Sequence, residues 1–505
     1  MTRYPIGIIF IAVLFFNTCS KEVKDTSLSS VGIPEDNIIA KVGNRIVTVS
    51  EFIKRSEYTV RPSYCRGDNI IHKKIILNSL IGEKLLSLEA TDISLSSHLN
   101  KYIQGRKEQV MRELLYYEKG HKDVQISTET LNRFSTTADR KYKVLFSRFP
   151  DSMIADEILH LMEQGFSYEE IFDAAFGLDS IPERSVDFFS EEDPHIVKKI
   201  FSEKLEKDEV LPPFKANDGS FLWIKVKGWT KTPVITAPAQ KVFLQDIDEK
   251  LNRLEAIRKY NEYTAGLMSG KKMELNEDAF SMFLEVASNY YFGSVNDNKL
   301  IEIILNIDEE IVEKPDFDTM KSDDIKMPFM YFDERTWSIG EIQELIDSHP
   351  LVFRKKRIKK DEFPKQLKFA LADLMRDHYL TAEAYKIGYD KHESVLLEKY
   401  LWEDHLYASL KKEQILEEKG LSVENDRDYL NVMGDYIGML QKKYSDQIMI
   451  NFREFDKINL SHIDMVALKP SVPYSHPVPS FPVLTQDHSI DYGKEIHYLQ
   501  SNDNN

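Results

Sequence analysis

One short pattern occurs twice in this chain: "RIVTVSEF" recurs 290 residues later as "RTWSIGEI". Each copy has an arginine, residues of strand character, a hydroxyl residue and a glutamate three positions after that hydroxyl. The hydroxyl and the glutamate form a capping box, Thr48 with Glu51 and Ser338 with Glu341, which predicts a strand that runs directly into the first turn of a helix. A box of four residues arises by chance in most long chains, so the repeat needs independent support.

A second pair of stretches supplies that support. "LIGEKLLSLEA" (80–90) aligns with "LMRDHYLTAEA" (374–384) when four extra residues are allowed in the second copy. Both keep an apolar face of helical period and a closing Glu-Ala. Two blocks in the same order, with only a loop-sized shift between them, predict that a helix-rich unit is duplicated within the chain.

The segment between the copies has a different character. "KYKVLFSRF" and "DGSFLWIKVKGW" have strand composition, and between them lie two helical stretches, the candidate strand "SVDFFS" and a helix begun by Pro194. The order strand, helix, helix, strand, helix, strand predicts a small α+β domain. The expected class of the whole chain is therefore α+β, mainly helical.

We expect seven divisions along the chain. They are a signal (1–19), a tether (20–36), a first helical domain (37–137), the α+β domain (138–232), a linker with helices that pack on the first helical domain (233–315), a second helical domain (316–455) and a Pro-rich C-terminal tail (456–505). A tail of this composition is extended, and it is more often a disordered end than a ligand for a partner.

The length and the net charge of the chain limit the classes of function that are expected. A chain of 505 residues exceeds one ordinary core, and 42% hydrophobic with 30% charged residues describes soluble globular material. The net charge of -17 argues against nucleic acid as a partner, because phosphate is bound chiefly by Lys and Arg.

The first twenty residues resemble the signal of a bacterial lipoprotein. Arg3 precedes the eleven apolar residues "IGIIFIAVLFF", too few to span a bilayer, and Cys19 follows at the expected cleavage point before a polar stretch. Cys19 is then the lipidated first residue of a mature protein that faces the periplasm, and Ser20 favours the outer membrane over the inner one. The alternative is an ordinary secretory signal with an incidental cysteine.

Other chemistry is not indicated. If Cys19 carries lipid, Cys65 is the only thiol left and no internal disulfide is possible. With no histidine nearby to activate it, we interpret Cys65 as a structural or incidental thiol. The sequence has no G-x-x-x-x-G-K-[ST], H-E-x-x-H, G-x-S-x-G or paired C-x-x-C motif. Two histidines nine residues apart in "HSIDYGKEIH" are a weak metal pattern, so neither a metal nor a cofactor is expected.

Several stretches together resemble the SurA/PrsA group of exported folding factors. "IIAKVGNRIVTVSEF" is similar to the N-terminal element of that group, "MEQGFSYEEIFDAAF" to the two-helix segment of its parvulin-type prolyl isomerase domain, and "LEKDEVLPPFKANDGSFLWIKV" to the closing part of that domain. The resemblance implies helical chaperone domains, here duplicated, around a parvulin-like domain. It also implies unfolded or outer-membrane polypeptides as partners.

The resemblance fails at the catalytic residues. The parvulin site is built around two histidines that face each other across the sheet, beside an apolar pocket for the proline ring. Lys143 stands in the place of the first histidine and Leu222 in the place of the second, while Phe201 stands where the family has a pocket aromatic. Phe201 is more often a core residue at such a helical position. The other histidines of this block, His160 and His195, are expected on exposed helix surfaces.

Three functions remain open. The leading hypothesis is a lipid-anchored chaperone that binds polypeptides without catalysis. An active peptidyl-prolyl isomerase with an altered pocket is the second, since proline isomerisation needs desolvation and twisting more than acid–base chemistry. The third is a structural lipoprotein subunit of an envelope assembly.

Overall fold

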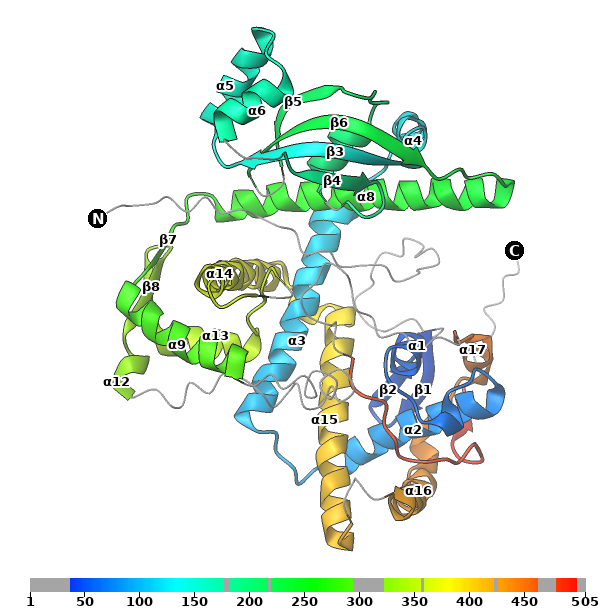
Figure 1. The fold of residues 1–505 in the computed structure, drawn as a ribbon. Helices are drawn as coiled ribbons and strands as arrows, with labels where there is room; N and C mark the ends of the chain where they lie inside the picture. Colours follow the sequence, from blue (N-terminus) through cyan, green and yellow to red (C-terminus); the bar gives the residue numbers. More distant parts are fainter. Residues whose placement is uncertain are drawn as a thin grey trace. The chain divides into compact units, whose positions relative to one another are not determined.

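The computed structural model describes residues 37–176, 181–191, 193–216, 219–293, 322–355, 358–421, 426–461 and 478–496. The expected signal, tether and lipidation residue Cys19 lie outside these ranges. The fold is a mixed α+β arrangement of long helices and small sheets, as the sequence predicts (Figure 1). It divides into two compact units, which are described separately: unit 1 contains Glu113–Lys271, and unit 2 contains the described residues before and after it.

Unit 1 is built on a four-stranded antiparallel sheet in the order β4-β3-β6-β5. The strands are β3 (Arg140–Phe149), β4 (Glu183–Asp187), β5 (Val210–Lys215) and β6 (Phe221–Lys231). The predicted order of elements is present, with β5 as an additional strand. The two prolines in "VLPPFK" are the reason that β5 was not predicted as a strand from the sequence. They are tolerated because β5 lies at the edge of the sheet.

Helices cover both faces of this sheet. One face packs against α5 (Ser152–Glu163) and α6 (Tyr168–Phe176), and the other against α4 (Thr128–Ser135), α7 (Pro194–Phe201) and α8 (Ala237–Met268). Alternate residues of β3 and β6 serve the two cores, because successive strand side chains point to opposite faces. The sheet is therefore the middle layer of three (Figure 1).

The helices after the sheet do not pack as predicted. Ile247, Leu251 and Leu254 of α8 are buried in the core of unit 1, so this helix belongs with the sheet. The next helix, α9 (Glu277–Gly293), lies in unit 2. The expectation that both helices pack on the first helical domain as one group is thus wrong, because the apolar stripe of α8 matches the open face of the sheet.

The two copies of the sequence repeat fold alike. The elements of the first copy are β1 (Ile38–Val42), β2 (Arg45–Thr48), α1 (Val49–Glu57) and α2 (Ile70–Glu89); those of the second are β8 (Pro328–Phe332), β9 (Arg335–Ser338), α13 (Ile339–Ser348) and α14 (Phe363–Ile387). Ile38 lies opposite Thr48, Pro328 lies opposite Ser338, and each hairpin has a register shift immediately afterwards. We call the first copy and the residues packed on it lobe 1, and the second copy and its partners lobe 2.

Each lobe is completed by a strand and helix from elsewhere in the chain. In lobe 1, β10 (Ile448–Ile450) pairs with β1 and leads through Asn451 into α17 (Phe452–Lys457). In lobe 2, β7 (Met273–Leu275) pairs with β8 and leads through Asn276 into α9.

Asn451 and Asn276 make the same two hydrogen bonds at equivalent positions of the two lobes. Asn451 N donates to Ile39 O at 2.9 Å, and Asn276 N donates to Phe329 O at 2.8 Å. Each asparagine Oδ1 also accepts from a backbone N–H in the first turn of the helix that follows, at 3.2 Å and 3.1 Å. The repeat thus includes a strand–Asn–helix segment in each lobe. In lobe 1 this segment comes after the hairpin and its two helices in the sequence, and in lobe 2 it comes before them.

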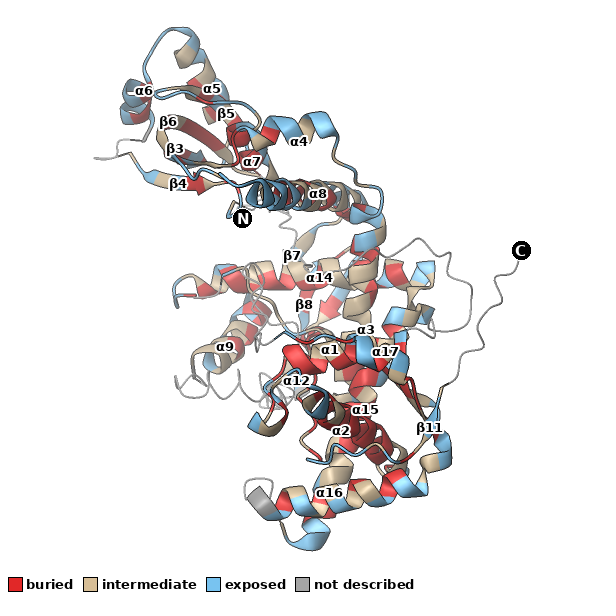
Figure 2. Ribbon diagram, turned by 90° about the vertical axis from the view of Figure 1, so that its right-hand side faces the viewer, coloured by how far each residue is buried: buried red, intermediate tan, exposed pale blue. Residues whose placement is uncertain are grey.

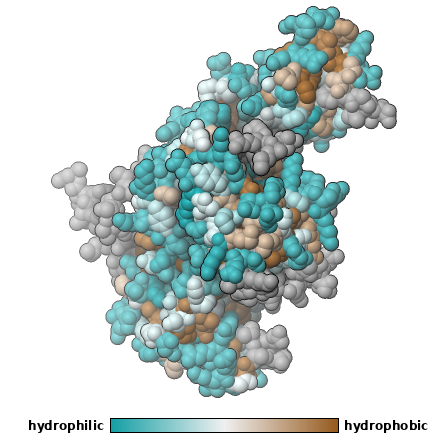
Figure 3. Space-filling model, turned by 90° about the vertical axis from the view of Figure 1, so that its left-hand side faces the viewer, coloured by the Kyte–Doolittle hydropathy of each residue, from teal (hydrophilic) through white to brown (hydrophobic). Residues whose placement is uncertain are grey.

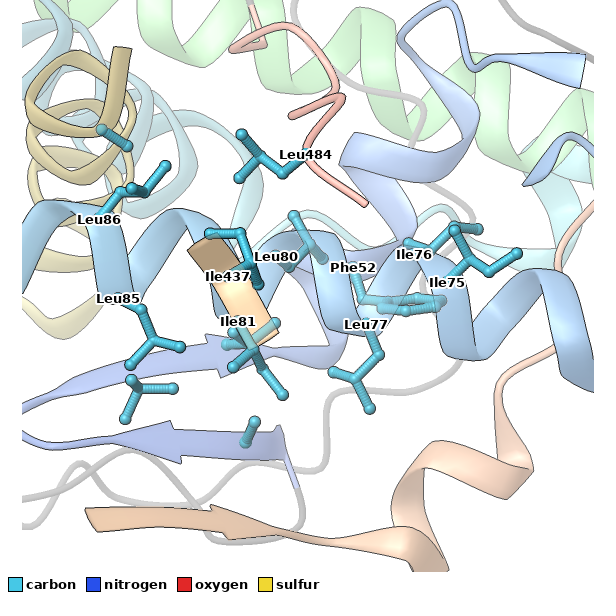
Figure 4. Close-up of a cluster of buried hydrophobic side chains, with 14 of the residues drawn as sticks. Phe52, Ile75, Ile76, Leu77, Leu80, Ile81, Leu85, Leu86, Ile437 and Leu484 are labelled. Atoms are coloured by element: carbon cyan, nitrogen blue, oxygen red, sulfur yellow. The ribbon is translucent and has the colours of Figure 1, made fainter. Parts of the chain in front are cut away.

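The expected domain limits of the two copies need correction. The core of lobe 1 includes residues of α15 (Glu393–Lys419) and α16 (Asp426–Lys443), which were expected in the second helical domain (316–455). The reason is the composition of α2, whose residues are buried around almost its whole circumference (Figure 2). Its own hairpin can cover only one side. Figure 4 shows Ile81 and Leu85 directed at the strands and Leu484 on the other side of the helix.

The prediction that the C-terminal tail is a disordered end is also wrong for the described part of that tail. Residues 478–496, which we call the strap, run over lobe 1 with Phe481 and Leu484 buried in its core; Val478 is buried as well. The strap is extended, as predicted, and ends in β11 (Lys494–Glu495), which lies parallel to β10.

The capping boxes are formed to different extents. Ser338 and Glu341 make both hydrogen bonds of the box. Thr48 accepts from Glu51 N at 3.0 Å, but the Glu51 carboxylate pairs with Lys84 at 2.8 Å. A buried lysine thus takes the carboxylate that would otherwise cap the helix.

The turns of the two hairpins lead to a stability prediction. Gly43 has φ 58° in the first hairpin, whereas the second has Asp333 at φ 49° and Glu334 at φ 64°. A left-handed conformation costs a residue with Cβ about 1–2 kcal/mol, offset partly by the freer unfolded chain of glycine. We expect Glu334→Gly to raise the melting temperature, with a gain of about 0.5–1 kcal/mol. Gly43→Ala is the opposite control and should lower it; a fall in both variants would contradict the argument.

Candidate functional site

The first candidate site is defined by Lys143, Leu222 and Phe201, which the resemblance places at catalytic positions and which all lie in unit 1. Lys143 is exposed on β3 and pairs with Glu183 of β4 at 2.7 Å. Its neighbours Tyr142 and Val144 belong to the core under α8, so the Lys143 side chain lies on the sheet face that carries α5 and α6. Glu183 also pairs with Lys227 at 2.6 Å, and hydrogen bonds from the two lysines lower its pKa to about 2.

Leu222 lies on the other face. It is buried in the core under α8, and its register partner on β3 is Arg148, five residues beyond Lys143. At about 3.4 Å per residue, the two positions are some 17 Å apart along the strands. The two positions therefore do not face each other across the sheet, because strand alternation and register separate them.

Phe201 is a core residue. It is fully buried, with its ring 5.5 Å from that of Tyr142 and 5.4 Å from that of Phe188, both in edge-to-face contact. Ile247 and Leu251 of α8 are part of the same buried cluster. His160 and His195 are exposed, as predicted, so the described residues of unit 1 bring no imidazole to this aromatic layer.

Sequence reasoning missed a buried charge network in lobe 1. Arg55 of α1 makes a bidentate pair with Glu83 of α2 at 2.9 and 2.8 Å, and His405 of α15 hydrogen-bonds to the same carboxylate at 3.0 Å. Lys84 pairs with Glu51 at 2.8 Å and with Asp404 at 3.0 Å. The signal in the sequence was the pair Glu-Lys inside the apolar run "LIGEKLL".

The electrostatics of this network favour the charged forms of Glu83 and Lys84, whereas burial raises the pKa of Glu51 in spite of Lys84. Burial would raise the pKa of Glu83, but Arg55 and His405 outweigh it and hold that pKa well below the usual range. The pKa of Lys84 is raised: burial acts to lower it, and the carboxylates of Glu51 and Asp404 outweigh this. Charges paired in this way are suited to fixing α1, α2 and α15 in place rather than to proton transfer.

A second polar cluster joins α3 (Ser97–Tyr116) to lobe 2. Glu108 accepts from Tyr385 at 3.0 Å and lies 2.5 Å from the Nε2 atom of His349. Burial opposes ionisation of Glu108, but hydrogen bonds led by that of His349 lower its pKa to about 2. Burial and the charge of Arg112 lower the pKa of His349 in spite of Glu108. Among the residues described, no group of three or more His, Cys, Asp or Glu side chains is placed so that it could hold a metal ion.

Exposed apolar side chains are the remaining candidates for a binding surface. On unit 1, Met153 of α5 is 72% exposed and Phe166, just after α5, is 49% exposed. Figure 3 shows apolar surface gathered over this part of the unit. Ile235, just before α8, and Val242, in the first turns of that helix, are also exposed. Methionine and aromatic side chains of this kind adapt to varied apolar partners.

Comparison with known proteins does not identify the chain. No protein-family model matches the sequence, and no curated protein matches it significantly. Within the described residues, every helix is too short or too polar to cross a membrane.

Proposed function

We propose that this chain is a lipid-anchored folding factor of the bacterial envelope that binds unfolded or outer-membrane polypeptides without catalysing proline isomerisation. In this proposal unit 1 is a parvulin-like domain, the two lobes are duplicated SurA N-terminal-like domains, and Cys19 carries the lipid in the outer membrane, facing the periplasm. Nucleic acid is not a partner, because the net charge is -17.

One observation carries the non-catalytic part of the proposal. Lys143 and Leu222 lie on opposite faces of the sheet, and Phe201 is sealed in the core beneath α8. A proline ring needs a pocket in which it can be desolvated beside polar groups, and these three positions cannot form one together. The exposed Met153 and Phe166 support polypeptide binding, since unfolded chains present apolar side chains.

The test uses the chain from Ser20 onward in two assays. Suppression of aggregation of a chemically unfolded client is expected at near-stoichiometric ratios, while a short X-Pro peptide should isomerise at its uncatalysed rate. A clear acceleration would favour the isomerase with an altered pocket. Loss of both activities, with stoichiometric co-purification of one envelope protein, would favour a structural subunit.

A variant sharpens the catalytic question. We expect the double variant Lys143→His with Leu222→His to remain at the uncatalysed isomerisation rate, because the new imidazoles would lie on opposite faces of the sheet. Lys143→His alone, at an exposed position, is the folding control. Isomerase activity in the double variant and not in the control would show that the two positions do converge.

A further inference from the structure

The strap is held on lobe 1 chiefly through its main chain; one side-chain bond adds to these contacts, from the Tyr492 hydroxyl to Asn78 Oδ1. Arg55 of α1 donates to Ser480 O, and the Tyr429 hydroxyl of α16 donates to Val483 O. Asn78 of α2 donates through Nδ2 to Asp487 O at 2.8 Å and to Ser489 O at 3.0 Å. Backbone carbonyls are common to every polypeptide, so the main-chain contacts do not depend on the side chains of the strap.

The donors are built into the lobe. Arg55 and Asn78 are both fully buried, and Tyr429 is 7% exposed. A buried donor left without an acceptor costs stability. The Asn78 amide and the Tyr429 hydroxyl therefore favour an extended chain that lies on them, whereas Arg55 also has the Glu83 carboxylate as an acceptor.

The side chains of the strap add an apolar component with a regular spacing. Val478, Phe481 and Leu484 are buried at intervals of three, and the first two are each followed by a buried proline in "VPSFPVL". Three residues per turn is the period of polyproline II, so in that conformation the three apolar side chains share one side. Figure 4 shows Leu484 close to α2.

Lobe 2 provides an internal comparison. In the alignment of the two copies, Arg55 corresponds to Leu345 and Asn78 to Ala372. Ala372 is half-buried on α14, whereas Asn78 is fully buried on α2. Lobe 2 therefore has neither polar group; in lobe 1 Asn78 donates to the strap, and Arg55 donates both to the strap and to Glu83.

We propose that lobe 1 contains a binding site for extended polypeptide, the strap site, and that the strap occupies it as a built-in competitor. The ligand class is an extended, proline-tolerant segment with an apolar residue at every third position. This inference rests on the proposed function, since it names where a client would bind and what holds the site closed. The strap is tethered, so a client must displace a segment present at high effective concentration.

The experiment releases the tether while keeping the whole chain. A specific protease site is placed between Ser461 and Val478, and a fluorophore is attached to the C-terminus. After cleavage, a synthetic peptide of residues 478–490 and a reduced, carboxymethylated, permanently unfolded protein should each displace the labelled strap. The cleaved form should bind the unfolded protein at least tenfold more tightly than the uncleaved form.

A conservative variant tests the assigned contacts. Tyr429→Phe keeps the ring and removes one bond to the strap, so it should speed displacement by about fivefold to tenfold. Tyr444→Phe is the matched control: that hydroxyl bonds to Glu89 on lobe 1 rather than to the strap, and displacement should be unchanged. Equal effects of the two variants would overturn the assignment.

The outcomes separate this inference from the proposed function. If the protein suppresses aggregation but the unfolded protein never displaces the strap, the strap is only a structural element and the inference fails. If there is neither suppression nor binding, the proposed function fails. If cleavage unfolds lobe 1, hydrogen exchange of the uncleaved chain decides: the strap amides must lose protection when the unfolded protein is added, and constant protection would overturn the inference.

Discussion

Replacing Glu83 by leucine is expected to lower the free energy of unfolding of lobe 1 by about 3–5 kcal/mol. The carboxylate is 1% exposed and compensates Arg55, which is fully buried, while also accepting from His405. Leucine would leave a buried guanidinium without its counter-charge, and removal of one partner costs far more than a pair of surface charges ever contributes.

The measurement is urea denaturation, with hydrogen exchange of the α2 peptides to assign the transition to lobe 1. Glu89→Gln is the control, since Glu89 ends the same helix and pairs with Lys443, which is 54% exposed. A loss below about 1 kcal/mol is expected there, as for other exposed pairs. Equal losses in the two variants would mean that solvent reaches the network.

The same carboxylate sets a dependence on pH. The folded pKa of Glu83 lies below its unfolded value of about 4.3, so its contribution is fully present above that pH and is lost as the pH falls through the folded pKa. The stability difference between the natural chain and Glu83→Leu should therefore be constant near neutrality and shrink below about pH 4.

Gly105→Ala is expected to loosen α3 from lobe 2 at a cost of about 1–3 kcal/mol. A Cβ added at Gly105 would lie 1.8 Å from the backbone oxygen of Ser348, at the end of α13. Neither atom can move aside without shifting a helix. The close packing of α3 on lobe 2 also allows Lys101 to pair with Asp347 at 3.1 Å and Arg112 to donate a hydrogen bond to Thr381 at 2.7 Å.

Gly266→Ala is the matched control for this variant. Gly266 lies in the exposed last turns of α8, where an added Cβ meets nothing within 4 Å. Alanine there should gain up to about 1 kcal/mol from helix propensity alone. Thermal unfolding should move in opposite directions for the two variants; an equal gain at Gly105 would show that α3 does not approach α13 so closely.

Sequence patterns predicted the local elements better than their partners. Both hairpins, both helix starts and the repeat follow from signals within about ten residues, such as the hydroxyl–glutamate boxes at Thr48 and Ser338. The third strand of each lobe is three residues long, and neither Ile448–Ile450 nor Met273–Leu275 has a period that could identify it. The pairing of these two strands with β1 and β8 therefore could not be predicted from the sequence.

The arrangement of the candidate site residues could not be predicted from the sequence either. An alignment fixed Lys143 and Leu222 by their order along the chain, and order does not determine which face of a strand a side chain occupies. A shift of one residue in register moves every side chain to the other face. The burial of Phe201 was predictable, because an apolar residue on a short amphipathic helix is usually part of a core.

The placement of β10 and β7 also has a consequence for the order of folding. The parts of lobe 2 are synthesised within one stretch, from Met273 to Ile387, whereas Ala40 of lobe 1 pairs with Ile450, 410 residues later. Contacts of such large sequence separation form slowly. The β1 strand thus has an open edge until β10 has been synthesised, and the sheet of lobe 1 cannot be completed before then.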